Sequence, residues 1–264
     1  MQGGLGPEGE NLACRACGHI FPTVRHIPDL RPVEPLRLPR IYDDPDYRTW
    51  VAGLAEAQEY FYRKGRIVSF IQRSGHRVVR RLREGRDSGI TLDLSCGDGA
   101  HYPFLHRPGA CLGIDIDQRS LEKLKSRFPD FGVVRADAYR LPLRDKTVDS
   151  IVNVYNLEHM AYLDLALEEM HRVLTAEGDL FASIPNEGGF FWGLGRRWST
   201  ARHFTSPRLD YQRAIQIDHI NCVWQVEKAL RRYFRIIRRV FFPLPLPVFH
   251  FNLVTAYWAQ KRAG

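Results

Sequence analysis

Five short apolar runs between residues 90 and 184 constrain the fold of this chain more than any other feature. Each run is bounded by turn residues and has a length typical of a strand. The runs lie at residues 90–94, 110–116, 132–136, 148–154 and 178–184. Between the last two runs, an apolar stripe with helical spacing consists of Leu163, Leu167, Met170 and Leu174. Strands that alternate with helices predict a parallel sheet covered on both faces, which is a doubly wound α/β fold.

Patterns on both sides of these runs extend the predicted domain. A helical region is expected at residues 50–83, and a later helical stripe consists of Val223, Val226, Leu230 and Tyr233. Two late strands are expected at residues 235–242 and 252–260, which would bring the mostly parallel sheet to seven strands. We therefore assign residues 50–264 to one main domain, in which residues 186–221 form an insertion.

The residues before this domain are expected to form a small appendage. Residues 1–11 are glycine-rich and polar and lack periodicity, so we expect them to be disordered. Residues 12–30 are a compact piece that contains Cys14 and Cys17. Residues 31–49 begin with a proline-rich stretch and are expected to be an extended linker that wraps onto the main domain.

Composition narrows the class of protein. A chain of 264 residues with 44% hydrophobic residues can bury a core, and its net charge of +8 suggests an anionic partner or substrate. No apolar stretch has membrane-spanning length, because prolines interrupt the longest candidate at residues 240–251. The start of the chain lacks the apolar core of a signal peptide, so a cytoplasmic location is expected. Five cysteines, an odd number, are expected to be reduced thiols.

The first apolar run ends in a glycine-rich turn within the stretch TLDLSCGDGA at residues 91–100. In an open parallel sheet, ligands lie beyond the carboxyl ends of the strands. Gly97 and Gly99 allow positive φ angles and a close approach of the backbone to a ligand. A dinucleotide-binding turn needs a third glycine where this chain has Tyr102. The turn alone fits either a ligand site or a plain connection from strand to helix.

Three successive strand ends carry an aspartate, namely Asp93, Asp115 and Asp137. Asp115 follows the turn by about 20 residues, where a carboxylate can accept both hydroxyl groups of a ribose. Asp137 and Ala138 can meet the exocyclic amine of an adenine. A cleft lined by carboxylates suits a cation and repels the phosphates of a dinucleotide. The pattern therefore favours a cationic ligand that contains adenosine.

Four stretches, LDLSCGDGAHY, GIDID, RADAYRLPLRDKTVDSIVNVYNLEHM and EEMHRVLTAEGDLFASIPN, resemble the class I S-adenosylmethionine-dependent methyltransferases, in particular the type 11 subgroup. The resemblance implies that the first turn holds the methionine end of the cofactor, Asp115 the ribose, and Asp137 with Ala138 the adenine. It also places Asn153 beside the sulfonium. The complete expected cofactor set is Asp93, Ser95, Cys96, Gly97, Gly99, Asp115, Ile116, Asp137, Ala138 and Asn153. Ser95 stands where the family usually has glycine, so the local backbone geometry is expected to differ there.

The chemistry implied by this resemblance needs few catalytic groups. S-adenosylmethionine carries an activated methyl group and leaves as S-adenosylhomocysteine, so the enzyme mainly aligns an acceptor and excludes water. If the acceptor is a hydroxyl, a general base helps. His159, in NLEHM, and His219, in DHINC, are the candidate bases. A structural role, such as holding a neighbouring segment, is the alternative for each histidine.

The acceptor surface is expected to come from residues 42–73 and 186–221. The second segment is long, aromatic and basic, and it can form a lid over an apolar or anionic acceptor or simply pack on the domain. FFPLPLPVFHF at residues 241–251 can be an apolar wall of the acceptor pocket or a stiff connection. A basic cluster that can meet phosphates or form a solvated face consists of Arg231, Arg232, Arg235, Arg238 and Arg239.

Cys14 and Cys17 belong to a stretch, CRACGHIFPTVRHIPDL, that resembles half of a zinc ribbon. A structural zinc ion takes four ligands, and only one cysteine pair is present here. His19 and His26 could complete the set. The alternative is a knuckle without metal, packed through its apolar residues.

The favoured function is methyl transfer from S-adenosylmethionine to an oxygen or nitrogen atom of a small-molecule acceptor, such as a sugar, a lipid-linked compound or a natural product. An RNA methyltransferase that uses the basic surface and the N-terminal knuckle is one alternative. A noncatalytic, partner-binding protein is another, against which the intact set of aspartates argues.

Overall fold

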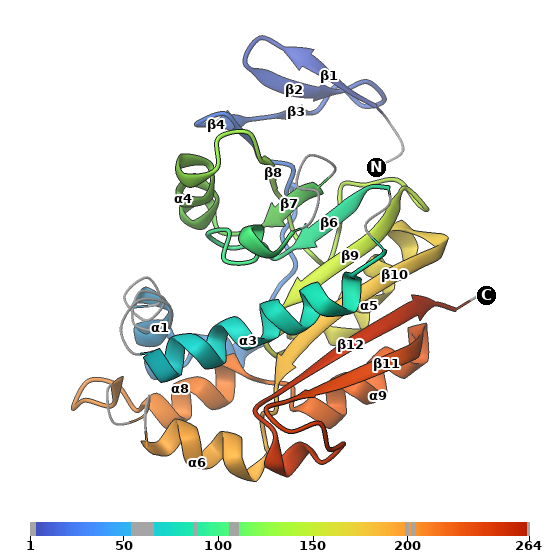
Figure 1. Cartoon of the computed structure of the whole chain (residues 1–264). Helices are drawn as coiled ribbons and strands as arrows, with labels where there is room; N and C mark the ends of the chain where they lie inside the picture. The colour runs from blue at the N-terminus through green and yellow to red at the C-terminus, as the bar shows by residue number, and fades with distance from the viewer. Residues whose placement is uncertain are drawn as a thin grey trace.

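A seven-stranded sheet forms the centre of the molecule (Figure 1), in a computed structural model that describes residues 4–53, 66–86, 89–105, 111–198, 201 and 204–262. The strand order is β11-β12-β10-β9-β6-β7-β8. The strands are β6 (Thr91–Leu94), β7 (Cys111–Asp115), β8 (Gly132–Arg135), β9 (Val148–Val154), β10 (Leu174–Pro185), β11 (Phe234–Phe242) and β12 (Val254–Lys261). β12 runs antiparallel to both of its neighbours, and the other pairs are parallel. The predicted doubly wound sheet is confirmed.

β10 is the strand whose predicted bounds differ most from the structure. It begins at Leu174, a residue that the sequence pattern assigns to the preceding helix. That helix, α5 (Leu163–Val173), ends one residue earlier, and Leu174 pairs with Val148 of β9. Leu174 is fully buried. Because a core residue at a junction is apolar whichever element it belongs to, periodicity does not distinguish the two assignments.

Helices cover both faces of the sheet. Ile151 and Val152 are neighbours in β9, so their side chains point to opposite faces, and they belong to two different cores. On the face of Val152, the helix α3 (Arg66–Arg83) packs on the sheet, as does α4 (Gln118–Arg127) further along. On the face of Ile151, α5 packs together with α9 (Val223–Tyr233). Figure 1 shows α3 crossing in front of the strands.

The helical region before β6 starts earlier than predicted. A 3-10 turn, η1 (Arg40–Asp43), leads into α1 (Pro45–Ala52), so the expectation of a linker over residues 31–49 is wrong for its last ten residues. The Asp44 side chain accepts hydrogen bonds from the backbone N–H groups of Asp46 and Tyr47, and Pro45 occupies the first helical position. These are strong helix-start signals, but the proline-rich stretch before them hides them. The predicted aromatic patch at residues 60–62 lies outside the described residues.

The insertion after β10 contains α6 (Phe190–Trp198) and α8 (Tyr211–Asp218). α8 packs against α1 through a small core of Trp50, Tyr211, Ala214 and Ile215. Short 3-10 turns complete the domain, namely η2 (Tyr102–Phe104), η4 (Leu157–His159) and η5 (Phe249–Phe251). The segments before β6 and after β10 therefore form one unit beside the sheet, although more than 150 residues separate Trp50 from Tyr211 in the sequence.

The N-terminal residues form a small sheet above the domain (Figure 1). It consists of β1 (Leu5–Glu8), β2 (Asn11–Cys14) and β3 (Ile20–Phe21), and a short hairpin of β4 (Thr23–Val24) and β5 (Ile27–Pro28) follows. The expected disorder of residues 1–11 is wrong for β1, which pairs antiparallel with β2 and contributes Leu5 to a small core. The glycine-rich composition does not reveal this pairing.

A backbone bridge connects the appendage to the edge of the main sheet. Asp29 pairs with Arg135 of β8, and the Leu30 N–H donates to the Arg135 carbonyl at 2.8 Å. The Asp29 carboxylate also accepts from the Arg31 and Arg135 guanidinium groups, at 2.9 and 3.1 Å. The appendage therefore covers the exposed edge of β8, where an open strand would otherwise be left.

Two predictions about the whole chain bear on the site. All five cysteines are free thiols. In the described part of the chain, no helix is long and apolar enough to cross a lipid bilayer.

Candidate functional site

A cavity of about 390 Å³ lies at the carboxyl edge of the parallel strands. Six residues of the cavity wall belong to the predicted site, namely Ser95, Asp115, Ile116, Asp137, Ala138 and His159. They come from the ends of β6, β7 and β8 and from η4. The position agrees with the rule that ligands of such sheets bind beyond the carboxyl ends of the strands.

The glycine-rich turn after β6 has an unusual backbone at three positions. Ser95, Gly97 and Gly99 have φ angles of 61°, 53° and 84°. Glycine adopts such angles freely, but a residue with a Cβ atom is strained there. Among the described residues, no atom lies within 4 Å of a Cβ added at Gly97, so the turn leaves open space on that side. Ser95 therefore has a left-handed backbone conformation, at a position where glycine would fit without strain.

The turn and the end of β7 are connected through Asp115. The Gly97 N–H donates to Asp115 Oδ2 at 2.8 Å, and the Asp117 N–H donates to Asp115 Oδ1 at the same distance. Burial raises the pKa of the Asp115 carboxyl, although these backbone donors oppose the shift. The two hydrogen bonds fix the orientation of the carboxylate at the cavity wall.

Asp93 lies directly behind the turn and is buried. Its Oδ2 atom has no hydrogen-bond partner among the residues that the structure describes. Burial raises the pKa of Asp93 to about 7, Arg83 opposes this shift and Asp115 adds to it. A buried carboxylate oxygen without a partner is costly, and a cationic group of a ligand would remove that cost. Together with the open space at Gly97, this atom shows that the residues present fit the methionine end of S-adenosylmethionine.

Asp137 marks the end of β8 at the same cavity. Its Oδ1 atom accepts a hydrogen bond from the Tyr139 N–H at 2.9 Å, and the described part of the chain provides no hydrogen-bond donor to Oδ2, which can therefore meet a ligand. Ala138 and Ile116 line the wall beside it. The wall between Asp115 and Asp137 is therefore apolar with a carboxylate at each end, which suits an adenosine.

Five predicted cofactor residues do not line the cavity, namely Asp93, Cys96, Gly97, Gly99 and Asn153. Asn153 is fully buried, and its amide donates to the Leu94 carbonyl at 3.1 Å. Cys96 is also buried, and burial raises the pKa of its thiol. Asn153 therefore supports the turn by holding the backbone at the end of β6. Asp93 lies directly behind the turn.

The proline-rich segment contributes a wall that the sequence did not predict. Pro35, Leu36 and Leu38 line the cavity, so the segment lies across the site. Two hydrogen bonds hold it: Tyr162 Oη donates to the Arg37 carbonyl at 2.9 Å, and Arg140 donates to the Glu34 carbonyl at 3.3 Å. A linker wrapped on the domain was expected, but its position over the cofactor cavity was not.

Tyr42 and Tyr47 also line the cavity, with their rings 5.1 Å apart. They belong to the segment in which the acceptor surface is expected. The Tyr42 hydroxyl is buried and has no hydrogen-bond partner among the described residues. Burial raises the pKa of Tyr42 to about 12, so this group is a neutral donor at physiological pH. Tyr42 and Tyr47 lie on either side of the helix-start signal at Asp44 and Pro45, and this signal could have identified the segment.

His159 also lines the cavity and belongs to a partly buried polar cluster. Its Nδ1 atom lies 3.2 Å from Asp218 Oδ1, and the other carboxylate oxygen of Asp218 accepts from Trp50 Nε1 at 2.9 Å. Burial disfavours the charged imidazole, but Asp218 and Glu158 outweigh it and raise the pKa of His159 to about 10. His159 is therefore a cation at neutral pH and donates hydrogen bonds.

His219 lies beside His159, with ring centroids 4.7 Å apart, but it does not line the cavity. Its Nδ1 atom lies 3.0 Å from Glu187 Oε2. Glu187 also accepts from Arg196 at 2.6 Å and from Trp192 Nε1 at 2.5 Å. Burial opposes ionisation of Glu187, but His219 and Arg196 outweigh it and lower its pKa. The insertion after β10 therefore contacts the cavity-lining His159 through the Asp218 carboxylate and the His219 ring.

The same cluster is the one group of metal-type ligands that the described residues bring together. His159, Asp218 and His219 each offer an atom within 4.8 Å of the others. Hydrogen bonds to His159 and Trp50 occupy the Asp218 oxygens, and Glu187 faces His219 Nδ1. Hydrogen bonding accounts for this geometry, and we assign no metal to it.

Cys14 and Cys17 do not gather further metal-type ligands in the described part of the chain. Cys14 is buried against Phe21, whereas Cys17 is exposed. His19 packs with its ring edge-on against Phe21, at 4.6 Å. Zinc binding by Cys14 and Cys17 stays a prediction.

Ion pairs occupy most of the basic cluster on α9 and β11. Arg231 and Arg239 both contact Glu227, and Arg232 contacts Asp164 at 2.6 Å. Arg235 donates to the side chain of Gln260. Of the two interpretations of this cluster, the contacts support a solvated face over a phosphate site.

Comparisons with known proteins agree with this site. Residues 92–182 match the type 11 methyltransferase domain family. The chain is 30% identical over 137 residues to a protein of Mycolicibacterium smegmatis named as a probable S-adenosylmethionine-dependent methyltransferase, covering 52% of this chain and 49% of that one. A Bacillus subtilis protein named for methylation of guanine N1 in 23S rRNA is 22% identical over 183 residues, covering 67% of this chain and 59% of that one. The chain spans about half the length of the curated relatives it matches.

Solved structures show the same fold. The N-methyltransferase NodS of Bradyrhizobium japonicum, in complex with S-adenosylhomocysteine, matches with a TM-score of 0.57 and 16% identity, covering 83% of this chain and all of that one. A methyltransferase of Archaeoglobus fulgidus matches with a TM-score of 0.56 and 15% identity, covering 78% of this chain and 99% of that one. The central part of this chain is a class I S-adenosylmethionine-dependent methyltransferase domain. The sequence resemblance to the type 11 subgroup is confirmed.

Proposed function

We propose that the whole protein transfers a methyl group from S-adenosylmethionine to an oxygen or nitrogen atom of a small-molecule acceptor. The observation that carries the proposal is one cavity whose wall includes the carboxylates of Asp115 and Asp137 and the charged His159. When bound, S-adenosylmethionine supplies a methyl group that is already activated by its sulfonium. Asp115 would accept the ribose hydroxyls, Asp137 and Ala138 would hold the adenine, and Asp93 with the glycine-rich turn would hold the methionine end.

The protein's own groups then orient the acceptor and exclude water. The Tyr42 hydroxyl and the His159 imidazolium are both hydrogen-bond donors in the cavity wall. A donor can hold a hydroxyl oxygen of the acceptor by one lone pair while the other attacks, and it can hold a neighbouring polar atom when the attacking atom is nitrogen. Leu36, Leu38 and Met160 cover the cavity with apolar side chains, which limits the access of water.

His159 has a positioning role in this proposal. A general base must be neutral before it takes a proton, and Asp218 holds His159 in its charged form. We therefore assign His159 to binding an electron-rich group of the acceptor. His219 stays a candidate base, although it contacts the ring of His159 and does not line the cavity itself.

An RNA acceptor is the second candidate, because the Bacillus subtilis relative named for 23S rRNA methylation covers 67% of this chain. The ion pairs on the arginine cluster of α9 and β11 weaken this candidate. A basic surface that binds RNA phosphates would need those guanidinium groups to be available.

The test is a transfer assay with S-adenosylmethionine that carries a tritiated methyl group. The purified protein is incubated separately with total RNA and with a small-molecule extract that has been freed of nucleic acid and protein. We expect label in the small-molecule fraction and loss of labelling in Asp115→Ala. Labelling should be unchanged in Glu177→Ala, because Glu177 is exposed and does not line the cavity.

Two outcomes would overturn the proposal. Label in RNA alone would establish the second candidate in its place. A protein that shows no thermal shift with either S-adenosylmethionine or S-adenosylhomocysteine would contradict methyl transfer altogether.

A further inference from the structure

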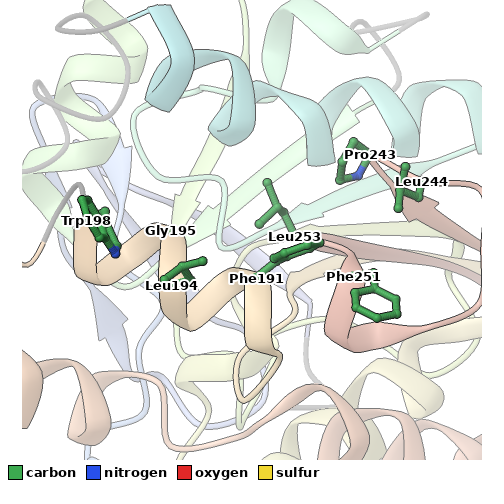
Figure 2. Close-up of a pocket in the computed structure, with 8 residues that line it drawn as sticks. All are labelled: Phe191, Leu194, Gly195, Trp198, Pro243, Leu244, Phe251 and Leu253. Carbon is green, nitrogen blue, oxygen red and sulfur yellow. The ribbon is translucent and has the colours of Figure 1, made fainter.

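A second hollow, of about 530 Å³, lies between α6 and the connection from β11 to β12 (Figure 2). Its wall consists of Phe191, Leu194, Gly195, Trp198, Pro243, Leu244, Phe251 and Leu253. Apart from Gly195, which has no side chain, all of these residues have apolar side chains, and the indole N–H of Trp198 is their one polar group. Several are strongly exposed, with 64% of Trp198 and 46% of Phe251 accessible to solvent. Exposed apolar surfaces of this kind mark binding sites. We call this hollow the α6 groove.

The helix α6 is shared between the α6 groove and the polar cluster of the cavity. Phe191, Leu194 and Trp198 follow helical spacing along one face of α6 and line the groove. Trp192 and Arg196 lie one turn apart on another face and donate to Glu187, which contacts His219. One short helix therefore has a polar face toward His219 and His159 and an apolar face toward the groove.

The α6 groove also lies at the same edge of the sheet as the cofactor cavity. α6 follows the carboxyl end of β10, and residues 243–253 connect the end of β11 to the start of antiparallel β12. Asn186 fixes the two parts together, because its amide donates to the Phe249 carbonyl at 3.1 Å and its carbonyl accepts from Thr255 at 2.6 Å. The groove therefore lies at the edge of the sheet where the cofactor cavity also lies, and Asn186 holds its two walls together.

We propose that the α6 groove binds the hydrocarbon chain of an amphiphilic acceptor whose polar head is methylated at the cavity. This inference rests on the proposed function and names its substrate class, an acyl or polyprenyl compound with a methylatable oxygen or nitrogen in its head. An alkyl chain has no polar atoms, and the groove wall has no charged side chain to satisfy. The groove and the cavity lie at the same edge of the sheet, and α6 contacts Glu187 beside His219, so an acceptor with an apolar chain and a polar head fits this arrangement better than an unrelated partner.

A matched pair of glycine substitutions tests the groove. Among the described residues, a Cβ atom added at Gly195 or at Gly193 meets nothing within 4 Å, so both positions in α6 accept a larger side chain. Only Gly195 lines the groove. Gly195→Phe fills the groove, and Gly193→Phe adds the same side chain to another face of the same helix.

The probes are octyl, decyl and dodecyl maltosides, titrated by calorimetry below their critical micelle concentrations. For the wild type we expect the affinity to rise with chain length by up to about fourfold per methylene group, as burial of a hydrocarbon chain predicts. Gly195→Phe is expected to lose at least tenfold in affinity for dodecyl maltoside, whereas Gly193→Phe retains it. Both variants should keep the thermal shift with S-adenosylhomocysteine.

The controls separate the possible failures. Absence of maltoside binding, or equal losses in the two variants, would overturn the groove proposal and leave the methyl-transfer proposal standing if the S-adenosylhomocysteine shift persists. Loss of that shift in the wild type would instead contradict the methyl-transfer proposal. Concentration-dependent dimerisation that only Gly195→Phe abolishes, or sedimentation with phosphatidylcholine vesicles that only Gly195→Phe abolishes, would assign the groove to a second copy or to a membrane and overturn the acceptor assignment.

Discussion

The Nδ1 atom of His159 lies 3.2 Å from the carboxylate of Asp218, although 59 residues separate them in the sequence. The contact connects η4, at the cavity, with the end of α8 in the insertion. Asp218 also accepts from Trp50 of α1, so one carboxylate holds together three segments that are distant in the chain. The ion pair is therefore a clamp between the methyltransferase sheet and the two segments expected to bind the acceptor.

This clamp predicts how the free energy of unfolding depends on pH. The pKa of His159 in the folded protein is raised to about 10, above its usual value near 6.5. Its contribution to stability is fully present below pH 6.5 and is lost as the pH rises through 10. We expect urea unfolding at pH 6, 8 and 10 to show a smaller loss of stability in His159→Gln than in the wild type.

His250→Gln is the control for this experiment, because His250 is an exposed residue outside the clamp. It should retain the pH dependence of the wild type. Identical slopes for His159→Gln and the wild type would show that the His159 and Asp218 pair does not stabilise the folded state.

Asp93 predicts a second loss of stability with rising pH, which here comes from an ionised buried carboxylate. Its pKa is raised to about 7 by burial, from an unfolded value near 3.8, so the wild type loses stability as the pH rises between these values. Asp93→Asn removes this loss. We expect the variant to be more stable than the wild type at pH 8 by about 1–3 kcal/mol, in the absence of ligand.

The same substitution should weaken binding of S-adenosylhomocysteine at least tenfold by calorimetry, because the ammonium group of the methionine end loses its carboxylate partner. In the wild type we expect this affinity to increase as the pH rises through 7, since Asp93 must ionise. Unchanged affinity between pH 6 and pH 8 would place the ammonium group away from Asp93.

Gly75 in α3 is the third test. The Gly75 N–H donates to the Tyr155 hydroxyl at 3.0 Å, and a Cβ atom added at Gly75 would lie 2.6 Å from the same side chain and 2.7 Å from Ser183. Alanine normally stabilises a helix interior relative to glycine. Here we expect Gly75→Ala to lower the free energy of unfolding by about 1–3 kcal/mol, because α3 must move off the sheet.

Gly193→Ala, in the open part of α6, provides the comparison and should be neutral or stabilising. A stabilising effect at both positions in the same urea titration would show that α3 does not pack on Tyr155 as closely as described.

The glycine-rich turn provides a fourth test through two reciprocal changes. Ser95 has a φ angle of 61°, so Ser95→Gly should relieve backbone strain and raise the free energy of unfolding by about 0.5–1 kcal/mol. Gly97 has a φ angle of 53°, so Gly97→Ala should lower it by about 1 kcal/mol and weaken cofactor binding. Thermal unfolding with and without S-adenosylhomocysteine measures both effects. A loss of stability in Ser95→Gly would mean that its side chain makes a contact worth more than the strain.

The sequence predicted the sheet well, because its strands are buried on both faces and their apolar runs stand out from the polar connections. β9 has the predicted bounds, and the other strands differ by a few residues at most. The three aspartates could be placed at one edge because the carboxyl ends of parallel strands meet there. The contacts of His159, Glu187 and Trp50 could not be predicted, because they join residues that only the tertiary fold brings together.

The insertion and the proline-rich segment were the least predictable parts for the same reason. Nothing in the local pattern around Pro35 indicates that this segment crosses the cofactor cavity. From the sequence, the apolar residues of α6 belong to an aromatic insertion, and those of the connection after β11 belong to a separate proline-rich segment. Only their positions on either side of one hollow indicate a shared ligand (Figure 2).

The segment at residues 35–38 has a consequence for the timing of the reaction cycle. It lies across the cavity and is anchored by hydrogen bonds from Tyr162 and Arg140 to its backbone carbonyls. We expect a nucleoside in the cavity to leave when these anchors open. The residence time of the spent cofactor would then depend on a stretch of chain that precedes the methyltransferase sheet.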